Sequence, residues 1–299
     1  NLTTAVTTFN APPRSGTAVL LNDFGNNFGG AVSVATAAPA VMSGPNLASY
    51  NLVQSAAANL SGRVLTVRNG GDVTLNRADN RFGLLRLVGV ANASVASAGS
   101  LTIADSTASG SIVAQAGGDI TLAGVLEAAG TGNAIVLATG GSFINTAGAT
   151  ALRASAGRWL VYSTDPALND FAGLASVQGG LWSHSYASNP PASILQPGNR
   201  YLFTTGRTLL VSPSDLVKAF GDDASAALGS AWAVAGLSAA TYGGALTVDT
   251  QAGILSGAPV VSSPGASPGA EVAGSPYAIN LSLGALAAAN GYALAAGPA

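Results

Sequence analysis

Charged side chains are scarce in this sequence. Only 8% of its 299 residues are charged, whereas ordinary globular domains carry about a quarter. The 11 basic and 13 acidic residues leave a net charge of −2, and Lys218 is the single lysine. Because a nucleic-acid-binding surface needs a dense stripe of Lys and Arg on a basic domain, we expect no nucleic-acid partner.

The residues that most often carry chemistry are also missing. There is no cysteine, which excludes disulfides, thiolate metal sites and a cysteine nucleophile. His184 is the only histidine, and one histidine cannot build a histidine-rich metal site. Ser163 and Asp165 lie close to each other in sequence, but no G-x-S-x-G nucleophile elbow stands between a strand and a helix. We therefore expect no catalytic residue, no metal and no cofactor.

Long hydrophobic runs are absent as well. No stretch of 18 or more apolar residues runs without polar or glycine breaks, so we expect no membrane span. The sequence opens at Asn1 without a signal peptide. We expect it to be a fragment or a processed product of a longer precursor.

The sequence is rich in glycine and small apolar residues, and it contains a repeated sequence motif, here called the phrase. The phrase is a short strand, a glycine corner and a second strand, and it recurs roughly every 20 to 28 residues, a period typical of solenoids. Its four copies are Leu65–Leu75, Val95–Ile103, Ile112–Leu122 and Ile135–Asn145. A unit this short cannot bury its apolar row alone, so the copies must stack.

Alternation within each copy predicts which side chains face the interior. Apolar residues and threonines alternate in the second strands, as in a half-buried strand. We therefore expect Val73, Leu101, Ile120 and Phe143 to lie one above another in the core of a parallel β-helix.

The corners have a shared composition. We expect glycine there because it reaches positive φ without a steric penalty, and Asp or Ser because each can bond backbone amides of the corner. The predicted structural corner residues are Gly71, Asp72, Gly99, Gly118, Asp119 and Gly141. Calcium is not expected, because the calcium-binding nonapeptide requires G-G-x-G-x-D in tandem.

Aromatic residues, only 6% of the chain, concentrate between about residues 160 and 207. Trp182, His184, Tyr186 and Tyr201 are candidates for an interaction surface, such as one that stacks on carbohydrate. The alternative, which we favour, is a hydrophobic plug that closes the open end of the solenoid.

Beyond residue 207 the pattern changes to short strands separated by turn signals, which predicts a small β-sandwich. The segment Val261–Gly274 is rich in Ser, Pro and Gly and is expected to be a long flexible loop. The predicted architecture is all-β: a right-handed parallel β-helix over residues 1–207, capped by about residues 160–207, followed by a β-sandwich over residues 208–299. The handedness comes only from the family resemblance described next.

Three segments resemble the shaft repeats and the following block of the filamentous haemagglutinin family of exoproteins. They are Asn26–Val34, Leu60–Val67 and Gly157–Pro166. The resemblance implies a secreted or cell-surface protein of a Gram-negative bacterium, exported through an outer-membrane partner barrel, with adhesion as its usual role. The amino-terminal secretion domain of the family, with its Asn-Pro-Asn-Gly-type motif, is missing from this sequence.

The carboxy-terminal part resembles the immunoglobulin-like MBG-type module of bacterial surface proteins. The similarity rests on Phe220-Gly221-Asp222, Gly236-Leu237 and Tyr277-Ala278-Ile279. Phe220 stands where tyrosine is usual, so the match is good but incomplete.

Three functions follow from these patterns. The first is a non-enzymatic structural and adhesive segment that contacts another surface or matrix protein or a glycan. The second is a self-assembling extracellular fibre or sheath subunit, whose partner is a copy of itself. The third is a carbohydrate-active enzyme, which would need paired carboxylates; Asp105, Asp119 and Glu127 do not recur at one position of the repeat.

Overall fold

A computed structural model describes residues 6–11, 31–36, 52–53, 59–68 and 71–297. The chain divides into two units, and each is described by itself. The solenoid unit contains residues 1–180, 184–204 and 241–246. The carboxy-terminal unit contains residues 181–183, 205–240 and 247–299. The main change between them falls after Thr204, whereas the sequence predicts the boundary after residue 207.

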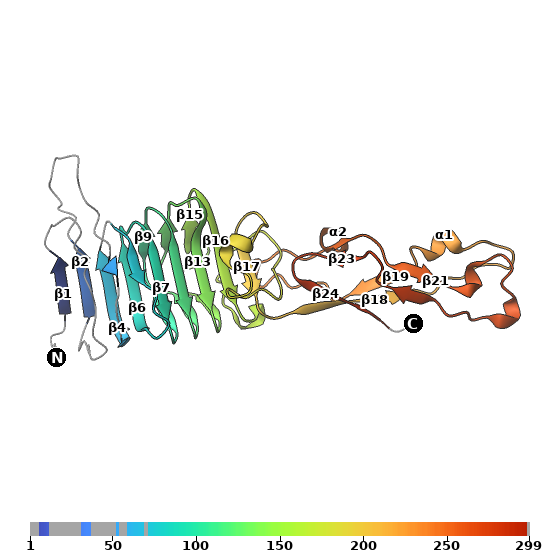
Figure 1. The fold of residues 1–299 in the computed structure, drawn as a ribbon, viewed down its shortest axis with the longest axis horizontal. Helices are drawn as coiled ribbons and strands as arrows, with labels where there is room; N and C mark the ends of the chain where they lie inside the picture. Colours follow the sequence, from blue (N-terminus) through green and yellow to red (C-terminus); the bar gives the residue numbers. More distant parts are fainter. Residues whose placement is uncertain (1–5, 12–30, 37–51, 54–58, 69–70, 298–299) are drawn as a thin grey trace. The chain divides into compact units, whose positions relative to one another are not determined.

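The solenoid unit consists of three parallel sheets (Figure 1). Sheet 1 contains β1 (Val6–Ala11), β2 (Ala31–Thr36), β4 (Asn59–Arg68), β6 (Arg81–Val88), β8 (Leu101–Ile103), β11 (Ile120–Leu122) and β14 (Phe143–Asn145). Sheet 2 contains β3 (Leu52–Val53), β5 (Val73–Leu75), β7 (Ala93–Ser97), β10 (Ile112–Ala116), β13 (Gly132–Thr139), β16 (Gly157–Ser163) and β17 (Arg200–Phe203). Sheet 3 contains β9 (Ser106–Ala108), β12 (Leu126–Ala128) and β15 (Leu152–Ala154).

The chain visits sheet 2, sheet 1 and sheet 3 in turn and then starts the next coil. Ile112 pairs in parallel with Ala93 in the preceding coil and with Ile135 in the following one. These two coils therefore take 19 and 23 residues, close to the period that the sequence indicates. The predicted parallel β-solenoid is confirmed.

The interior is built from the apolar residues of the alternating strands. In β8, β11 and β14 the two end residues are oriented inward, and the middle residue is partly exposed. Leu101, Ile120 and Phe143 are in register with one another and at most 1% exposed. Side chains of successive coils thus stack in one shared core, as expected.

Val73 is the exception to the expected stack. It is buried, but it lies in sheet 2 opposite Ala93 and not in sheet 1 below Leu101. The first copy of the phrase runs from sheet 1 (β4) to sheet 2 (β5), whereas the third copy runs from sheet 2 (β10) to sheet 1 (β11). The same short phrase therefore builds two different corners, which the sequence pattern alone does not distinguish.

The carboxy-terminal unit has smaller sheets. β18 (Arg207–Pro213) pairs antiparallel with β19 (Trp232–Ala235) and parallel with β24 (Tyr292–Ala296). Two antiparallel pairs accompany it: β20 (Leu255–Ser256) with β23 (Ala287–Ala288), and β21 (Val260–Ser262) with β22 (Asn280–Ser282).

Short helices complete this unit. The segment Val261–Gly274, predicted to be a loop, contains regular turns. α1 (Ser225–Leu228) and α2 (Gln251–Ile254) are single turns. The segment expected to be a flexible loop instead contains the end of β21 and the 3₁₀ turns Pro264–Ala266 and Val272–Gly274. Its turn-forming residues cap and shape these turns; Ser263, for example, accepts from the Gly265 N–H.

In the part of the chain that the structure describes, no helix has the length and hydrophobicity needed to cross a bilayer.

Gly118 and Gly141 are required by the closeness of the neighbouring coil and not by a positive φ. A Cβ added to Gly118 would lie 2.5 Å from Ser100 Oγ and 2.8 Å from Ser100 N in the preceding coil. A Cβ on Gly141 would collide with the Asp119 carboxylate. At Gly99 the nearest atom would be Arg81 Nη1 at 3.5 Å, an ordinary contact. The expected role of positive φ is therefore wrong at these three corners.

This difference gives a matched pair of substitutions. We expect Gly118→Ala to lower the free energy of unfolding by about 1–3 kcal/mol, because the added methyl group forces two coils apart. Gly99→Ala should be neutral or stabilising by up to about 1 kcal/mol, since it only restricts the unfolded chain. Chemical denaturation of both variants measures the difference, and equal loss in the two would contradict the close-approach explanation.

Candidate functional site

Polar side chains at the corners connect each coil to the next. Asp72 Oδ1 accepts from the backbone N–H of Asn92 at 3.1 Å and from its side-chain amide at 2.9 Å. Asn92 Oδ1 in turn accepts from the Ser111 N–H at 2.9 Å. Gly71 contributes its carbonyl oxygen, which accepts from the Ala91 N–H at 2.9 Å. This corner leads into sheet 2.

A second ladder follows the corner that leads into sheet 1. Ser100 Oγ accepts from the Asp119 N–H at 3.0 Å, and Asp119 Oδ1 accepts from the Ser142 N–H at 2.7 Å. Asp72 and Asp119 were expected to cap amides of their own corners. Each instead accepts from an amide of the following coil, so the two carboxylates tie successive coils together.

The Asp119 contact can be tested by replacing the acceptor. Asp119→Ala should lower the free energy of unfolding by about 1–2 kcal/mol, because the Ser142 amide loses its partner. Asp119→Asn keeps an Oδ1 acceptor in the same place and should recover most of that loss. Urea unfolding followed by circular dichroism distinguishes the two, and an equally large loss in both variants would contradict the role of Oδ1.

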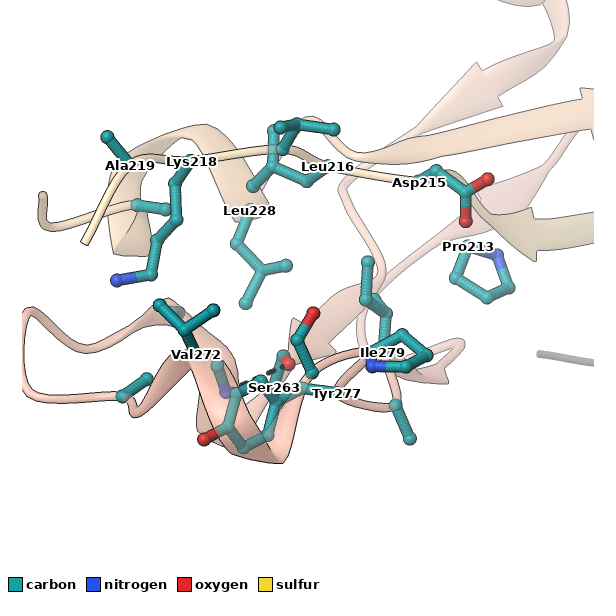
Figure 2. Close-up of a pocket in the computed structure, with 18 of the residues that line it drawn as sticks. Pro213, Asp215, Leu216, Lys218, Ala219, Leu228, Ser263, Val272, Tyr277 and Ile279 are labelled. Atoms are coloured by element: carbon teal, nitrogen blue, oxygen red, sulfur yellow. Dashed lines mark hydrogen bonds between the residues drawn. The ribbon is translucent and has the colours of Figure 1, made fainter.

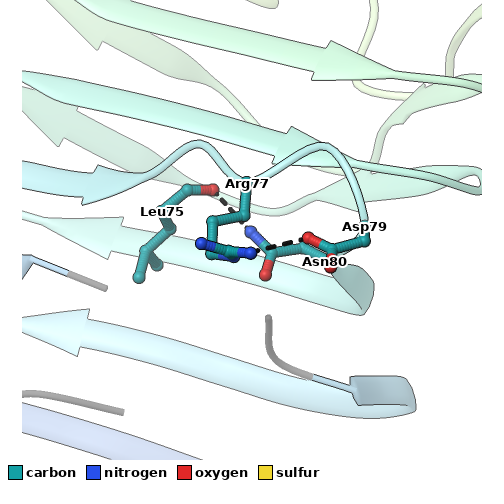
Figure 3. Close-up of polar contacts among 4 residues, drawn as sticks. All are labelled: Leu75, Arg77, Asp79 and Asn80. Atoms are coloured by element: carbon teal, nitrogen blue, oxygen red, sulfur yellow. Dashed lines mark hydrogen bonds and ion pairs between the residues drawn. The ribbon is translucent and has the colours of Figure 1, made fainter. Parts of the chain in front are cut away.

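The turn between β5 and β6 shows how a buried polar residue is accommodated (Figure 3). Asn80 is fully buried, and its side-chain amide donates to the Leu75 carbonyl at 2.9 Å. Arg77 Nε lies 3.5 Å from Asp79 Oδ1, and both side chains are more than 40% exposed. An exposed ion pair of this kind contributes little to stability, so the turn depends mainly on Asn80.

The aromatic residues of the solenoid unit form a packed cluster around Tyr201. Its ring centroid lies 4.7 Å from that of Phe171 and 4.8 Å from that of Trp159, both in edge contacts. Phe143, the last member of the stacked core row, lies 6.1 Å away. The Tyr201 hydroxyl donates to the Leu174 carbonyl at 2.8 Å. The cluster therefore continues the core beyond Phe143.

Side-chain oxygens of two asparagines in the plug accept backbone donors of β14 and β16. In β8 and β11 the first N–H donates to a carbonyl of the next coil, as Leu101 does to Asp119. At β14 the Phe143 N–H donates instead to Asn169 Oδ1 at 2.8 Å. The Trp159 N–H likewise donates to Asn199 Oδ1 at 2.9 Å. Two asparagine side chains thus accept donors that backbone carbonyls accept in β8 and β11.

Arg158 fastens the plug to the solenoid. Its Nε donates to Asn133 Oδ1 at 2.6 Å, its Nη2 donates to the Ile194 carbonyl at 2.6 Å, and its Nη1 donates to the Gln196 carbonyl. Burial lowers the pKa of the guanidinium from its ordinary value. The Tyr162 hydroxyl adds a bond to the Asn189 carbonyl at 2.9 Å.

The candidate surface residues are more buried than a carbohydrate-stacking site requires. Trp182 and Tyr201 are 0% exposed, which corrects the expectation that they contribute to a surface. Trp182 lies in the carboxy-terminal unit, 4.1 Å below the Arg207 guanidinium. His184 and Tyr186 are partly exposed; the His184 N–H donates to the Phe203 carbonyl, and the Tyr186 ring is 5.5 Å from that of Tyr162.

Burial also gives Tyr201 a pH dependence. Desolvation raises the pKa of its hydroxyl well above the ordinary value of about 10. Because the folded pKa is higher than the unfolded pKa, this group's contribution is complete below pH 10 and is lost as pH rises above it. The shifted pKa values of Tyr162 and Tyr292 act in the same direction.

We therefore expect unfolding at alkaline pH, and a smaller alkaline loss in Tyr201→Phe. This variant should be about 1 kcal/mol less stable at pH 7, where the hydroxyl bond is missing. Its stability should then fall less than that of the wild type between pH 9 and pH 12. Urea unfolding at several pH values tests this, with Tyr242→Phe as a control; identical pH profiles for Tyr201→Phe and the wild type would contradict it.

Three of the acidic and hydroxyl residues that the sequence raised as catalytic candidates form structural hydrogen bonds. Ser163 Oγ accepts from the Asn169 side chain at 2.8 Å, and Asp165 Oδ1 caps a 3₁₀ turn through the Ala167 N–H. Asp105 Oδ1 accepts from the Val125 N–H at 2.9 Å, and Glu127 is exposed on the outer face of β12. Within the described ranges no three His, Cys, Asp or Glu residues gather closely enough to hold a metal ion.

Sequence patterns did not reveal a cleft in the carboxy-terminal unit (Figure 2). It has a volume of about 790 Å³ and lies between residues 213–220 and residues 263–279. Leu228 and Ala266, two buried members of this unit's core, line it. Leu216, Val217 and Phe220 are the sequence feature that could have indicated this cleft. They are apolar but fit neither a strand nor a helix periodicity.

Comparison with known families supports the repeat character of the chain. A family model described as repeats of unknown function (DUF5649) matches residues 2–35 and 43–87. The chain is a β-helix repeat protein. The match covers well under half of the sequence and ends within β6. Neither the curated proteins nor the solved structures contain a significant match to the chain.

Proposed function

We propose that this chain is a non-enzymatic structural and adhesive segment of a secreted or surface-anchored Gram-negative exoprotein of the filamentous haemagglutinin type. In this proposal the right-handed solenoid is a spacer, and residues 208–299 form an immunoglobulin-like MBG-type sandwich. A surface protein, a matrix protein or a glycan is the partner, and an outer-membrane barrel exports the chain.

The observation that carries the proposal is the continuous parallel ladder with side chains tied from coil to coil. Each added coil lengthens such a ladder by about 4.8 Å. The corner residues Asp72, Asn92, Ser100 and Asp119 are all engaged between coils. Polar side chains that hydrogen-bond between coils stiffen the solenoid and are not free for catalysis. A stiff solenoid suits the role of a spacer.

The low charge and the plug also support a structural role. Few charged groups are available to bind an ionic substrate. The rings around Tyr201 pack against one another and against Phe143, and Asn199 accepts from the Trp159 N–H, which supports a shaft whose core is covered at this end.

Two alternatives remain. A self-assembling fibre or sheath subunit would use the same shaft with another copy as its partner. A carbohydrate-active enzyme would need two carboxylates about 5–9.5 Å apart on one face. Asp105 and Asp119 each accept a backbone amide of the next coil, which makes this second alternative the weaker one.

Surface labelling tests the proposal. Antibodies raised against the purified chain should label intact cells of the source organism, and a strain that lacks the gene should lose both the labelling and part of its adherence. Labelling that appears only after the cells are permeabilised would overturn the proposal.

Two further measurements separate the alternatives. Sedimentation showing filaments of the purified chain would favour the fibre subunit. Cleavage in a glycan panel that is lost in Asp119→Ala but retained in the equally destabilised Gly118→Ala would favour the enzyme.

A further inference from the structure

The cleft between residues 213–220 and 263–279, here called the 213–279 cleft, has one wall without regular secondary structure after Pro213 and a second wall that contains the 3₁₀ turns Pro264–Ala266 and Val272–Gly274. The first wall follows directly from β18, and the second leads into β22. In Figure 2 the side chain of Leu228 points into the space between these walls. The 790 Å³ volume is in the range of sites that enclose a ligand.

The first wall has an unused main-chain edge. Ser214 donates its N–H to the Ala231 carbonyl, and Ala219 donates its N–H to the Asp222 carboxylate. Between them, the peptide groups of residues 215–218 form no hydrogen bond with any described residue. A segment whose main-chain donors and acceptors are unused can pair with an added strand.

Exposed apolar side chains concentrate at this cleft. Of the eleven large hydrophobic residues that are exposed in the described chain, four line it. They are Leu216, Val217, Phe220 and Val272. Val217 is 94% exposed and Val272 is 70% exposed, and such clustering marks an interaction site.

The charge of the lining favours a basic partner. Lys218 donates from Nζ to the carbonyl oxygens of Asp222, at 2.9 Å, and Ser267, at 2.8 Å, so its ammonium group holds the two walls together. The carboxylates of Asp215 and Glu271 also line the cleft, are exposed and form no ion pair among the described residues. The available charge in the cleft is therefore negative.

We propose that the 213–279 cleft binds an extended peptide strand of a partner protein, in which apolar and basic side chains alternate. The strand pairs with the main chain of residues 215–218. Its apolar side chains contact Leu228, Phe220 and Val272, and its basic side chains approach Asp215 and Glu271. This inference concerns the carboxy-terminal unit alone and holds whether or not the shaft is a spacer.

Hydrogen exchange with a defined probe tests the inference on the full chain. The probe is a capped hexapeptide of alternating valine and lysine. We expect it to slow exchange of the amides of residues 215–218 at least fivefold. A valine–glutamate hexapeptide should protect them at least tenfold more weakly, and so should a valine–lysine peptide N-methylated at alternate residues, which lacks half of the strand's donors.

Matched variants locate the binding. Val272→Ser should weaken binding of the valine–lysine peptide at least fivefold, whereas Val248→Ser should leave it unchanged, because Val248 is 50% exposed in the same unit but does not line the cleft. Asp215→Asn combined with Glu271→Gln should remove the preference for lysine over glutamate. Circular dichroism checks that each variant is folded.

Three results would overturn the proposal. They are equal binding of all three peptides, equal losses in Val272→Ser and Val248→Ser, and no protection of residues 215–218. Protection that appears without peptide as the protein concentration rises would assign the cleft to a second copy of this chain and would also overturn it.

Discussion

The close approach of successive coils is the constraint on which the solenoid depends. Parallel strands in adjacent coils must lie about 4.8 Å apart to hydrogen-bond, and the corners must reach the same spacing. Gly118 and Gly141 have no room for a methyl group for this reason. The corner side chains use the same short distance, because an aspartate or serine in one coil reaches the amide of the next.

The interior of the solenoid could be predicted from the sequence, because alternation of apolar and polar residues directly encodes which side chains face inward. Leu101, Ile120 and Phe143 stack as expected. Which corner a phrase occupies could not be predicted, as Val73 shows. A strand–turn–strand segment has the same local residue preferences at every corner of a coil. Which corner it forms depends on the length of the whole coil.

The candidate site was predicted less well, and the reason is again physical. An aromatic residue in a sequence can be a surface for stacking or a core filler, and only its neighbours distinguish the two. Tyr201 is enclosed by Trp159 and Phe171, which are 30 to 42 residues away along the chain. The 213–279 cleft joins segments about 50 residues apart, and neither segment has a periodic pattern that would reveal the other.

The asparagines that finish the solenoid make its ending independent of its size. Asn169 accepts from the Phe143 N–H of β14 and donates to Ser163 Oγ of β16, and Asn199 accepts from the Trp159 N–H of β16. Coils inserted or deleted earlier in the chain would leave these contacts intact. Such a shaft can become longer or shorter during evolution by gaining or losing repeats, while the contacts at its carboxy-terminal end stay the same.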